Sequence, residues 1–292
     1  MVSSPHASQS VDKKQKNGLI LAVVYVTALF FIWAFVTNLI DPLIKSMKVI
    51  YHLNMFEAML TQPAFFVGYL LMSLPSAWVL SKSGYAKSII IGLACIVFGC
   101  LVAWSTVFSH EYLTVLIGLF IAASGVALLQ VAANPLISTM GDVKSSHFRL
   151  NLSQAFNSLG AFCGGMFGAT YLLKGDLFKK NIEITDTLKA QGLSFVTNVY
   201  LEIAAVLAVF TLAVFLVRNT IAQHAPKIPA HAPAPFKALT SKWANLGALA
   251  IFFGVGAEVT VLSGLLFFLE QEHILNVPSQ VAGKIAPFFM LF

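Results

Sequence analysis

Apolar runs of about twenty residues recur along this chain, and this is the length that a helix needs to cross a bilayer. At about 1.5 Å of rise per residue, such a run spans the roughly 30 Å of hydrocarbon. The runs are continuous in Leu, Ile, Val, Phe and Ala, so they predict helices and not the alternating strands of a barrel. Hydrophobic residues make up 58% of the chain and charged residues 10%, against about 25% charged in soluble domains. The sequence therefore predicts an all-α integral membrane protein.

The runs predict a series of spanning helices and a further one that begins near Pro278 and is still open at Phe292. The preceding helices are predicted at 19–40, 58–80, 86–108, 112–140, 149–173, 195–217 and 243–270. The segment 219–242 is long, basic and rich in Pro and Ala, which is typical of a linker. The predicted organisation is a cytoplasmic tail (1–18), a six-helix bundle (19–218), a cytoplasmic linker (219–242) and the start of a second bundle (243–292).

The net charge of +6 is distributed in a way that predicts the orientation. With the N-terminus inside, the loops on that side hold more Lys and Arg than the outer loops, to which we assign Lys45 and Lys48. This pattern predicts a cytoplasmic N-terminus and a lipid bilayer around the apolar surface. Cytoplasmic loops account for the positive charge, so no nucleic-acid partner is expected.

A short internal repeat relates the first predicted helix to the fourth. Residues 42–47 (Pro-Leu-Ile-Lys-Ser-Met) match residues 135–140 (Pro-Leu-Ile-Ser-Thr-Met), and a weaker match relates the second helix to the fifth. These pairs correspond when a six-helix half is built from two inverted three-helix units. Because such repeats place substrates near the midplane, the pattern favours a transporter over a channel.

Asp41 is the first ionisable residue inside an apolar run, where a charge costs about 2.5–3.5 kcal/mol and needs a partner or a cavity. Asn38 lies three residues earlier, on the same helix face. Apolar residues continue beyond Pro42, which predicts a kinked helix with Asp41 as a functional group. The alternative is that Asp41 ends the helix at the outer interface.

Side-chain amides cluster in the fourth and fifth predicted helices. Gln130 and Asn134 lie four residues apart, and Gln154 and Asn157 belong to a polar run that opens the fifth helix. They are either interhelical hydrogen-bond partners or contacts to a ligand. Since amides both donate and accept, they suit a neutral ligand covered in hydroxyl groups.

Two further residues are candidates for function. Glu258 lies midway along the predicted helix 243–270, where desolvation makes it a plausible proton carrier, whereas Glu270 is assigned to the following loop. Trp33 lies inside the first helix, where it either stacks on a sugar ring or packs in the core.

The sequence shows no cofactor motif, metal-ligand spacing or nucleophile–base pair, so no enzyme is predicted.

Several segments together resemble one known family. They are Phe31-Ile32-Trp33-Ala34 with Asn38 and Asp41, then LQVAANP at 129–135, HFRLNLSQAFNSLG at 147–160 and VGAEV at 255–259. They resemble the fucose permease branch of the major facilitator superfamily, the fucose–glucose/galactose–H⁺ symporters, over nearly everything from about residue 19 onward.

The resemblance implies a major-facilitator-type bundle that transports sugar with protons by alternating access. It implies that Asp41 is the protonatable aspartate of the first helix and that Gln154 and Asn157 line the cavity. Gln130 stands where the fucose permease has a glutamate, which favours a glucose/galactose-type cargo. Because the family has twelve helices in two halves, we expect a complete N-terminal half and about two helices of the second, as in a C-terminally truncated member.

We therefore predict a proton-coupled hexose transporter of the inner (plasma) membrane, with glucose or galactose as its cargo. Asp41 and Glu258 are the predicted proton-coupling residues. The predicted sugar contacts are Trp33, Asn38, Gln130, Asn134, Gln154 and Asn157. Three alternatives stay open: a fucose or N-acetylhexosamine symporter, a sodium-coupled relative, and a non-transporting truncated remnant.

Overall fold

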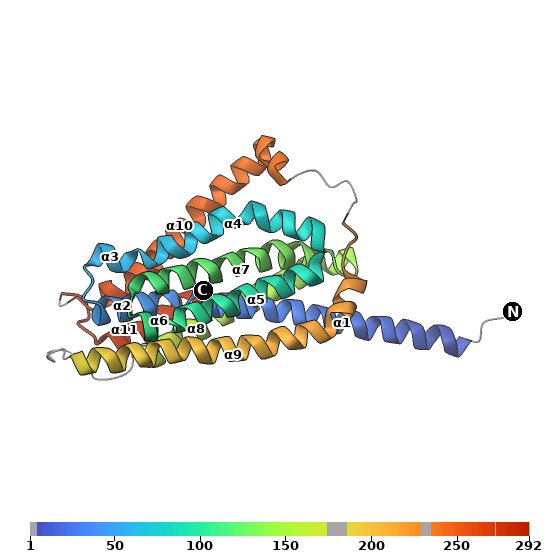
Figure 1. Ribbon diagram of the computed structural model, residues 1–292. Coiled ribbons are helices and arrows are strands. Elements are labelled where there is room, and N and C mark those ends of the chain that lie inside the picture. Colours follow the sequence, from blue (N-terminus) through green and yellow to red (C-terminus); the bar gives the residue numbers. More distant parts are fainter. Residues whose placement is uncertain (1–4, 174–185, 229–234, 272, 292) are drawn as a thin grey trace.

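The computed structural model describes residues 5–173, 186–228, 235–271 and 273–291, and in these ranges the regular structure is helical throughout. Most helices run side by side, and α1 projects beyond one end of the bundle (Figure 1). The α-helices are α1 (Pro5–Thr37), α2 (Ile40–Ile50), α3 (Met55–Met59), α4 (Thr61–Ser83), α5 (Tyr85–Trp104), α6 (Thr106–Ser109), α7 (Tyr112–Thr139), α8 (Ser146–Tyr171), α9 (Asp186–His224), α10 (Lys242–Leu269) and α11 (Ser279–Ile285). Short 3₁₀ helices cover η1 (Val143–Ser145), η3 (Pro235–Thr240) and η4 (Ala286–Leu291).

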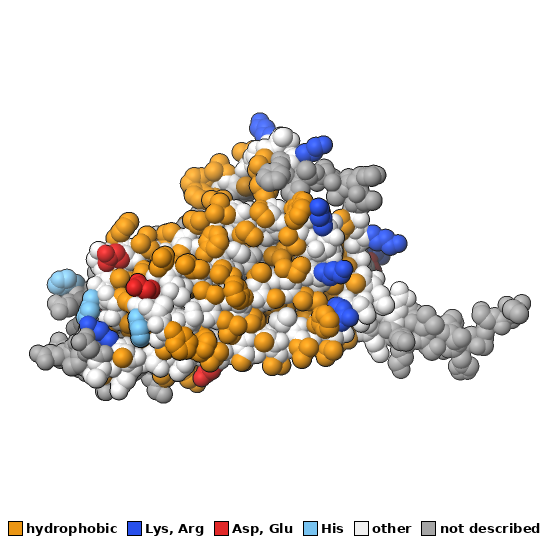
Figure 2. All heavy atoms as spheres, viewed as in Figure 1, with side chains coloured by type: hydrophobic (Ala, Val, Ile, Leu, Met, Phe, Trp, Pro, Cys, Tyr) orange, Lys and Arg blue, Asp and Glu red, His pale blue; other side chains and the backbone are white. Residues whose placement is uncertain are grey.

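The surface and the helix lengths are those of a membrane protein. Among the described residues, 6 helical segments are long and apolar enough to cross a bilayer. Apolar side chains cover the middle of the visible face and charged ones lie mainly toward its ends (Figure 2). Helix α8 is not in that set because amides and glycines lower its hydropathy, yet it packs within the bundle against α1. The predicted all-α membrane fold is confirmed.

The first spanning segment is broken at Asn38 and Leu39, between α1 and α2. Pro42 explains the break, because proline has no N–H to donate to the carbonyl four residues earlier and its ring crowds that carbonyl. The chain continues as a helix to Ile50, so the predicted interruption near Pro42 is confirmed. The assignment of Lys45 to an outer loop is wrong, because this residue lies in the middle of α2 with 9% of its surface exposed.

Helix α8 approaches α1 closely because glycines line its contact face. A Cβ added at Gly160 or Gly164 would collide with the main chain of α1 at Phe31 or Phe35. One added at Gly168 would lie 2.7 Å from the ring of Pro42. Small residues at this spacing let two backbones approach in a membrane, where dispersion contacts drive helix association.

The corresponding contact in the internal repeat is also made through glycine. If α1 corresponds to α7 and α4 to α8, the α1–α8 contact corresponds to the α7–α4 contact. Gly68 of α4 packs there, with an added Cβ 2.9 Å from both Ala123 and the carbonyl oxygen of Phe120. Helices α5 and α7 also approach through Gly92 and Gly125.

Helix α10 meets the bundle only through its last turns, and the short helix α11 packs beside it at the same end of the bundle. Every residue of α10 from Lys242 to Glu258 is exposed, whereas Leu266 is 2% exposed. Helix α11 and η4 pack against α8, where a Cβ at Gly165 would lie 2.5 Å from Pro287.

Two predicted boundaries differ from the structure. Helix α9 continues to His224, so the predicted linker 219–242 begins inside a helix, and its residues 229–234 lie outside the described ranges. Helix α1 begins at Pro5, within the segment predicted as a tail, whose residues 1–4 also lie outside those ranges.

Gly164→Ala is expected to destabilise the bundle by about 1–3 kcal/mol, because its methyl group forces α8 away from α1. The measurement is the melting temperature of the purified protein in detergent. Gly254→Ala is the matched control, since its added Cβ meets open space and Ala gains up to about 1 kcal/mol of helix propensity. Equal melting temperatures for the two variants would contradict the close α1–α8 contact.

Candidate functional site

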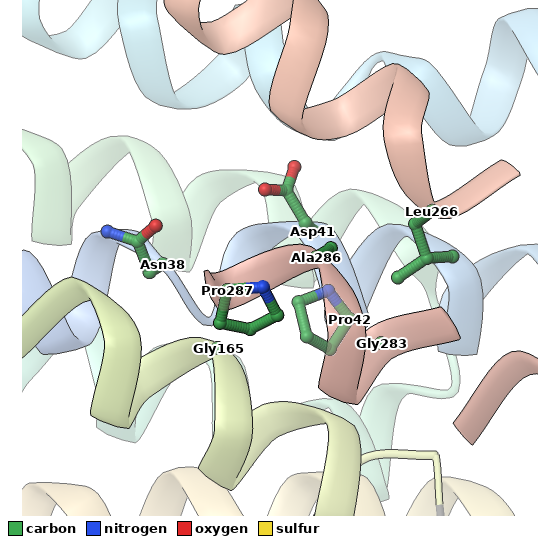
Figure 3. A pocket seen from close by; sticks show the side chains of 8 residues that line it. All are labelled: Asn38, Asp41, Pro42, Gly165, Leu266, Gly283, Ala286 and Pro287. Atoms are coloured by element: carbon green, nitrogen blue, oxygen red, sulfur yellow. The ribbon is translucent and has the colours of Figure 1, made fainter. Parts of the chain in front are cut away.

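A pocket lies where the break between α1 and α2 faces α8, α10 and α11 (Figure 3). Its lining residues are Asn38, Asp41, Pro42, Gly165, Leu266, Gly283, Ala286 and Pro287. Only Asn38 and Asp41 bring polar side chains to it. The pocket is thus shared between two parts of the N-terminal half, namely the α1–α2 break and α8, and the helices that follow residue 242.

Asp41 occupies the first turn of α2, where the unpaired N–H groups of the helix favour a negative charge. Its Oδ1 accepts a hydrogen bond of 3.2 Å from Nε2 of Gln62 on α4. The side chain is half-buried in a mainly apolar pocket, so its negative charge depends on the polar groups around it. The gain or loss of one proton at Asp41 therefore changes the charge that these polar groups have to stabilise.

Asn38 completes the polar part of the pocket. Its Nδ2 donates to the carbonyl oxygen of Ala34 at 2.9 Å, which ties the side chain back onto the last turn of α1. The break therefore brings Asn38 and Asp41 to one pocket, whereas the sequence predicted their proximity from spacing along one helix face.

A second polar group lies between α1, α4 and α7. Nε2 of Gln130 donates to the hydroxyl of Tyr69 at 3.2 Å, and this hydroxyl also hydrogen-bonds the side chain of Thr37. Thr37 in turn donates to the carbonyl oxygen of Trp33 at 2.8 Å. Gln130 is therefore held in an interhelical hydrogen bond, outside the lining of the pocket near Asp41.

The other predicted amides lie apart from this pocket. Asn134 and Gln154 are exposed, while Asn157 is half-buried and donates to the carbonyl oxygen of Phe30 at 3.4 Å. An amide that faced lipid would leave its hydrogen-bonding groups unsatisfied. In a bilayer, the faces that carry Asn134 and Gln154 must therefore border water or protein.

Trp33 and Glu258 are not brought to the pocket. Trp33 is 4% exposed, and its ring centroid lies 4.2 Å from that of Phe30, so it packs in the core. Glu258 lies on the exposed stretch of α10. Of the predicted site residues, the pocket contains Asn38 and Asp41 alone.

The sequence did not identify three of the residues that hold the polar groups. Gln62 and Tyr69 are seven residues apart on α4, and this helical spacing was the available signal. Glu270, assigned to a loop, is the C-terminal cap of α10 and forms an ion pair with Lys45. Lys45 follows Asp41 by four residues, a spacing that places the two on the same face of α2.

Comparison with known proteins gives the family. Residues 26–292 match the Major Facilitator Superfamily, and the chain belongs to it. It is 33% identical over 273 residues to the glucose/galactose transporter of Brucella abortus (strain 9-941), covering 92% of this chain and 63% of that protein. It is 31% identical over 298 residues to the L-fucose-proton symporter of Escherichia coli (strain K12), covering 95% of this chain and 66% of the symporter.

The solved structures agree. The crystal structure of FucP in the outward conformation superposes with a TM-score of 0.67 at 28% identity, covering 94% of this chain and 69% of FucP. The D-xylose-proton symporter shares the fold, with a TM-score of 0.62 at 12% identity. The chain thus spans slightly less than two thirds of the length of the curated relatives it matches. It is a multi-pass membrane protein with a complete six-helix N-terminal half and the first helices of the second half.

Tyr69→Phe is expected to lower stability by about 0.6–2 kcal/mol, because it removes a hydroxyl that joins α4 to α1 and α7. The measurement is again the melting temperature in detergent. Tyr171→Phe is the control, since this side chain is 42% exposed and its ring stacking on Phe167 survives the change. A Tyr69→Phe variant as stable as this control would show that the hydroxyl contributes nothing.

Proposed function

We propose that the protein is a proton-coupled sugar transporter of the inner (plasma) membrane, working by alternating access with a hexose such as glucose or galactose. The observation that carries the proposal is the position of Asp41, in a pocket between the N-terminal bundle and the helices that begin the second half. A proton that binds there changes the charge at the surface along which the two parts move. The names of the relatives support sugar as the cargo and a proton as the coupling ion.

The electrostatics of the pocket support Asp41 as the coupling residue. When Asp41 is ionised, Gln62 and the N-terminus of α2 stabilise its charge. Protonation removes that charge and reduces the cost of enclosing the group in apolar surroundings. A protonated Asp41 therefore favours closure of the pocket, and loss of the proton favours its opening to water.

The amides support a neutral, hydroxyl-rich cargo. Asn134 and Gln154 present both donors and acceptors on exposed surfaces, and Asn157 lies one turn from Gln154. Gln130 cannot titrate, so Asp41 has no second carboxylate at that position to share the proton. We assign sugar contact to these amides, and a secondary coupling role to Glu258, on this chemistry and on the sequence motifs.

The charge distribution supports a cytoplasmic N-terminus. Lys and Arg side chains gather toward the end of the bundle from which α1 projects (Figure 2). Such an excess marks the cytoplasmic side of a membrane protein.

Asp41→Asn is expected to abolish uphill sugar accumulation while leaving sugar exchange intact, because an amide cannot carry the proton but keeps the size of the side chain. The measurement is uptake of labelled D-glucose, D-galactose and L-fucose into proteoliposomes with an imposed pH gradient. Glu202→Gln is the matched control, an exposed carboxylate of α9 outside the pocket. Unimpaired accumulation by Asp41→Asn would refute the role of Asp41.

The same assay separates the alternatives. Uptake that resists a protonophore and requires sodium identifies a sodium-coupled relative, and preference for L-fucose moves the cargo away from glucose. Sugar binding without flux in the wild-type chain identifies a non-transporting form. If Glu258→Gln accumulates sugar like the wild type, the secondary coupling role falls and that of Asp41 stands.

A further inference from the structure

Lys45 lies at a junction between the two parts of the chain. Its Nζ forms an ion pair with Oε2 of Glu270, which caps the C-terminal end of α10. The exposed fractions of the two side chains are 11% and 18%, so both charges are largely withdrawn from solvent. This ion pair joins the N-terminal half to the second half at the same end of α10 that lines the pocket of Asp41.

The last turns of α10 form the point at which this helix meets the bundle. Leu266 and Leu269 are 2% and 7% exposed, in contrast with the exposed stretch that ends at Glu258. Phe267 lies between them, and its ring centroid is 5.1 Å from Nζ of Lys45 and 5.7 Å from that of Lys48. The ion pair, the cation–π contacts and the apolar packing therefore all involve one short segment, residues 266–270.

The charges at this junction are unevenly satisfied. Oε1 of Glu270 is buried and has no hydrogen-bond partner in the described structure, so only half of this carboxylate is compensated. A lysine has three N–H donors that it can distribute among neighbouring acceptors. The strength of the Lys45–Glu270 contact therefore depends on what else attracts the ammonium group.

Asp41 is the acidic residue that helical spacing places nearest to Lys45 on α2. The two residues are four apart on α2, a spacing that places their side chains on the same face. Leu266 lines the pocket that contains Asp41, so the end of α10 borders both groups. Lys45 thus pairs with a carboxylate on α10 and shares a helix face with a carboxylate on α2.

We propose that Lys45 is a counter-ion shared between Asp41 and Glu270, and that it couples the charge on Asp41 to the contact between α2 and α10. An ionised Asp41 competes with Glu270 for the ammonium group and loosens the end of α10. A neutral Asp41 leaves the ammonium group to Glu270, and the end of α10 closes over the pocket. The inference rests on the proposed function in one respect, namely that Asp41 gains and loses a proton during transport.

The test measures how well the end of α10 covers the pocket. Leu266→Cys is placed in a full-length chain whose native thiols, Cys95, Cys100 and Cys163, are replaced by Ala, and its alkylation by a water-soluble maleimide is timed. Lys45→Gln and Glu270→Gln are each expected to raise the rate by about tenfold or more, because each removes the ion pair that holds the end of α10 against α2. Lys45→Arg keeps the positive charge and should retain the slow rate.

The coupling is read from a double-mutant cycle. Asp41→Asn alone is expected to slow alkylation of Leu266→Cys severalfold, and in the Lys45→Gln background it should have no effect. An Asp41→Asn effect that persists without Lys45, or no effect in either background, overturns the proposal. Leu275→Cys, in the exposed loop after α10, is the control site and should react equally in every folded variant.

The alkylation assay needs neither sugar nor a gradient, so the two proposals fail separately. If Asp41→Asn slows alkylation but still accumulates sugar, proton coupling through Asp41 is refuted and the shared counter-ion stands. If accumulation is lost while alkylation is unchanged in every background, the shared counter-ion is refuted and the coupling role of Asp41 stands.

Discussion

The structure depends on how the first spanning segment satisfies its backbone groups around Pro42. In a bilayer an unpaired carbonyl costs several kcal/mol, so a break in a spanning helix persists only where protein or water compensates it. Here the break at Asn38 and Leu39 faces other helices and the pocket. It also creates a new helix N-terminus, and Asp41 occupies its first turn. One proline thus determines where a charge is tolerated in the bundle.

Helix α8 supports that break because its glycines bring it into contact with α1 and α2. Gly164 meets the main chain just before the break, and Gly168 meets the ring of Pro42 just after it. The neighbouring Gly165 packs against Pro287 of η4. The same helix therefore contacts both the break and the second half, and all three border one pocket. The second half and the surroundings of Asp41 are therefore linked through α8.

The sequence predicted the features that local rules control. Hydropathy predicted most of the spanning helices, Pro42 predicted the interruption, and the short separation of Asn38 and Asp41 predicted that they lie close together. Partners that come from elsewhere in the chain were not predictable, because spacing along one helix does not say what faces it. Glu270 was therefore assigned to a loop, although it pairs with Lys45. The coupling role of Glu258 stays a prediction, and Glu258 lies on the exposed stretch of α10, of which only the last turns reach the bundle.

The polar residues of the bundle fall into two kinds that the sequence could not separate. Arg149 is 8% exposed, and its guanidinium donates to the carbonyl oxygens of Ile137 and Ser138 at 3.1 and 3.2 Å, so it satisfies the C-terminal end of α7. Asn134 and Gln154 are exposed on the same two helices and bind no described residue. Satisfied groups hold the bundle together, whereas exposed amides retain their capacity for a ligand. A cargo rich in hydroxyl groups can meet that capacity, and lipid cannot.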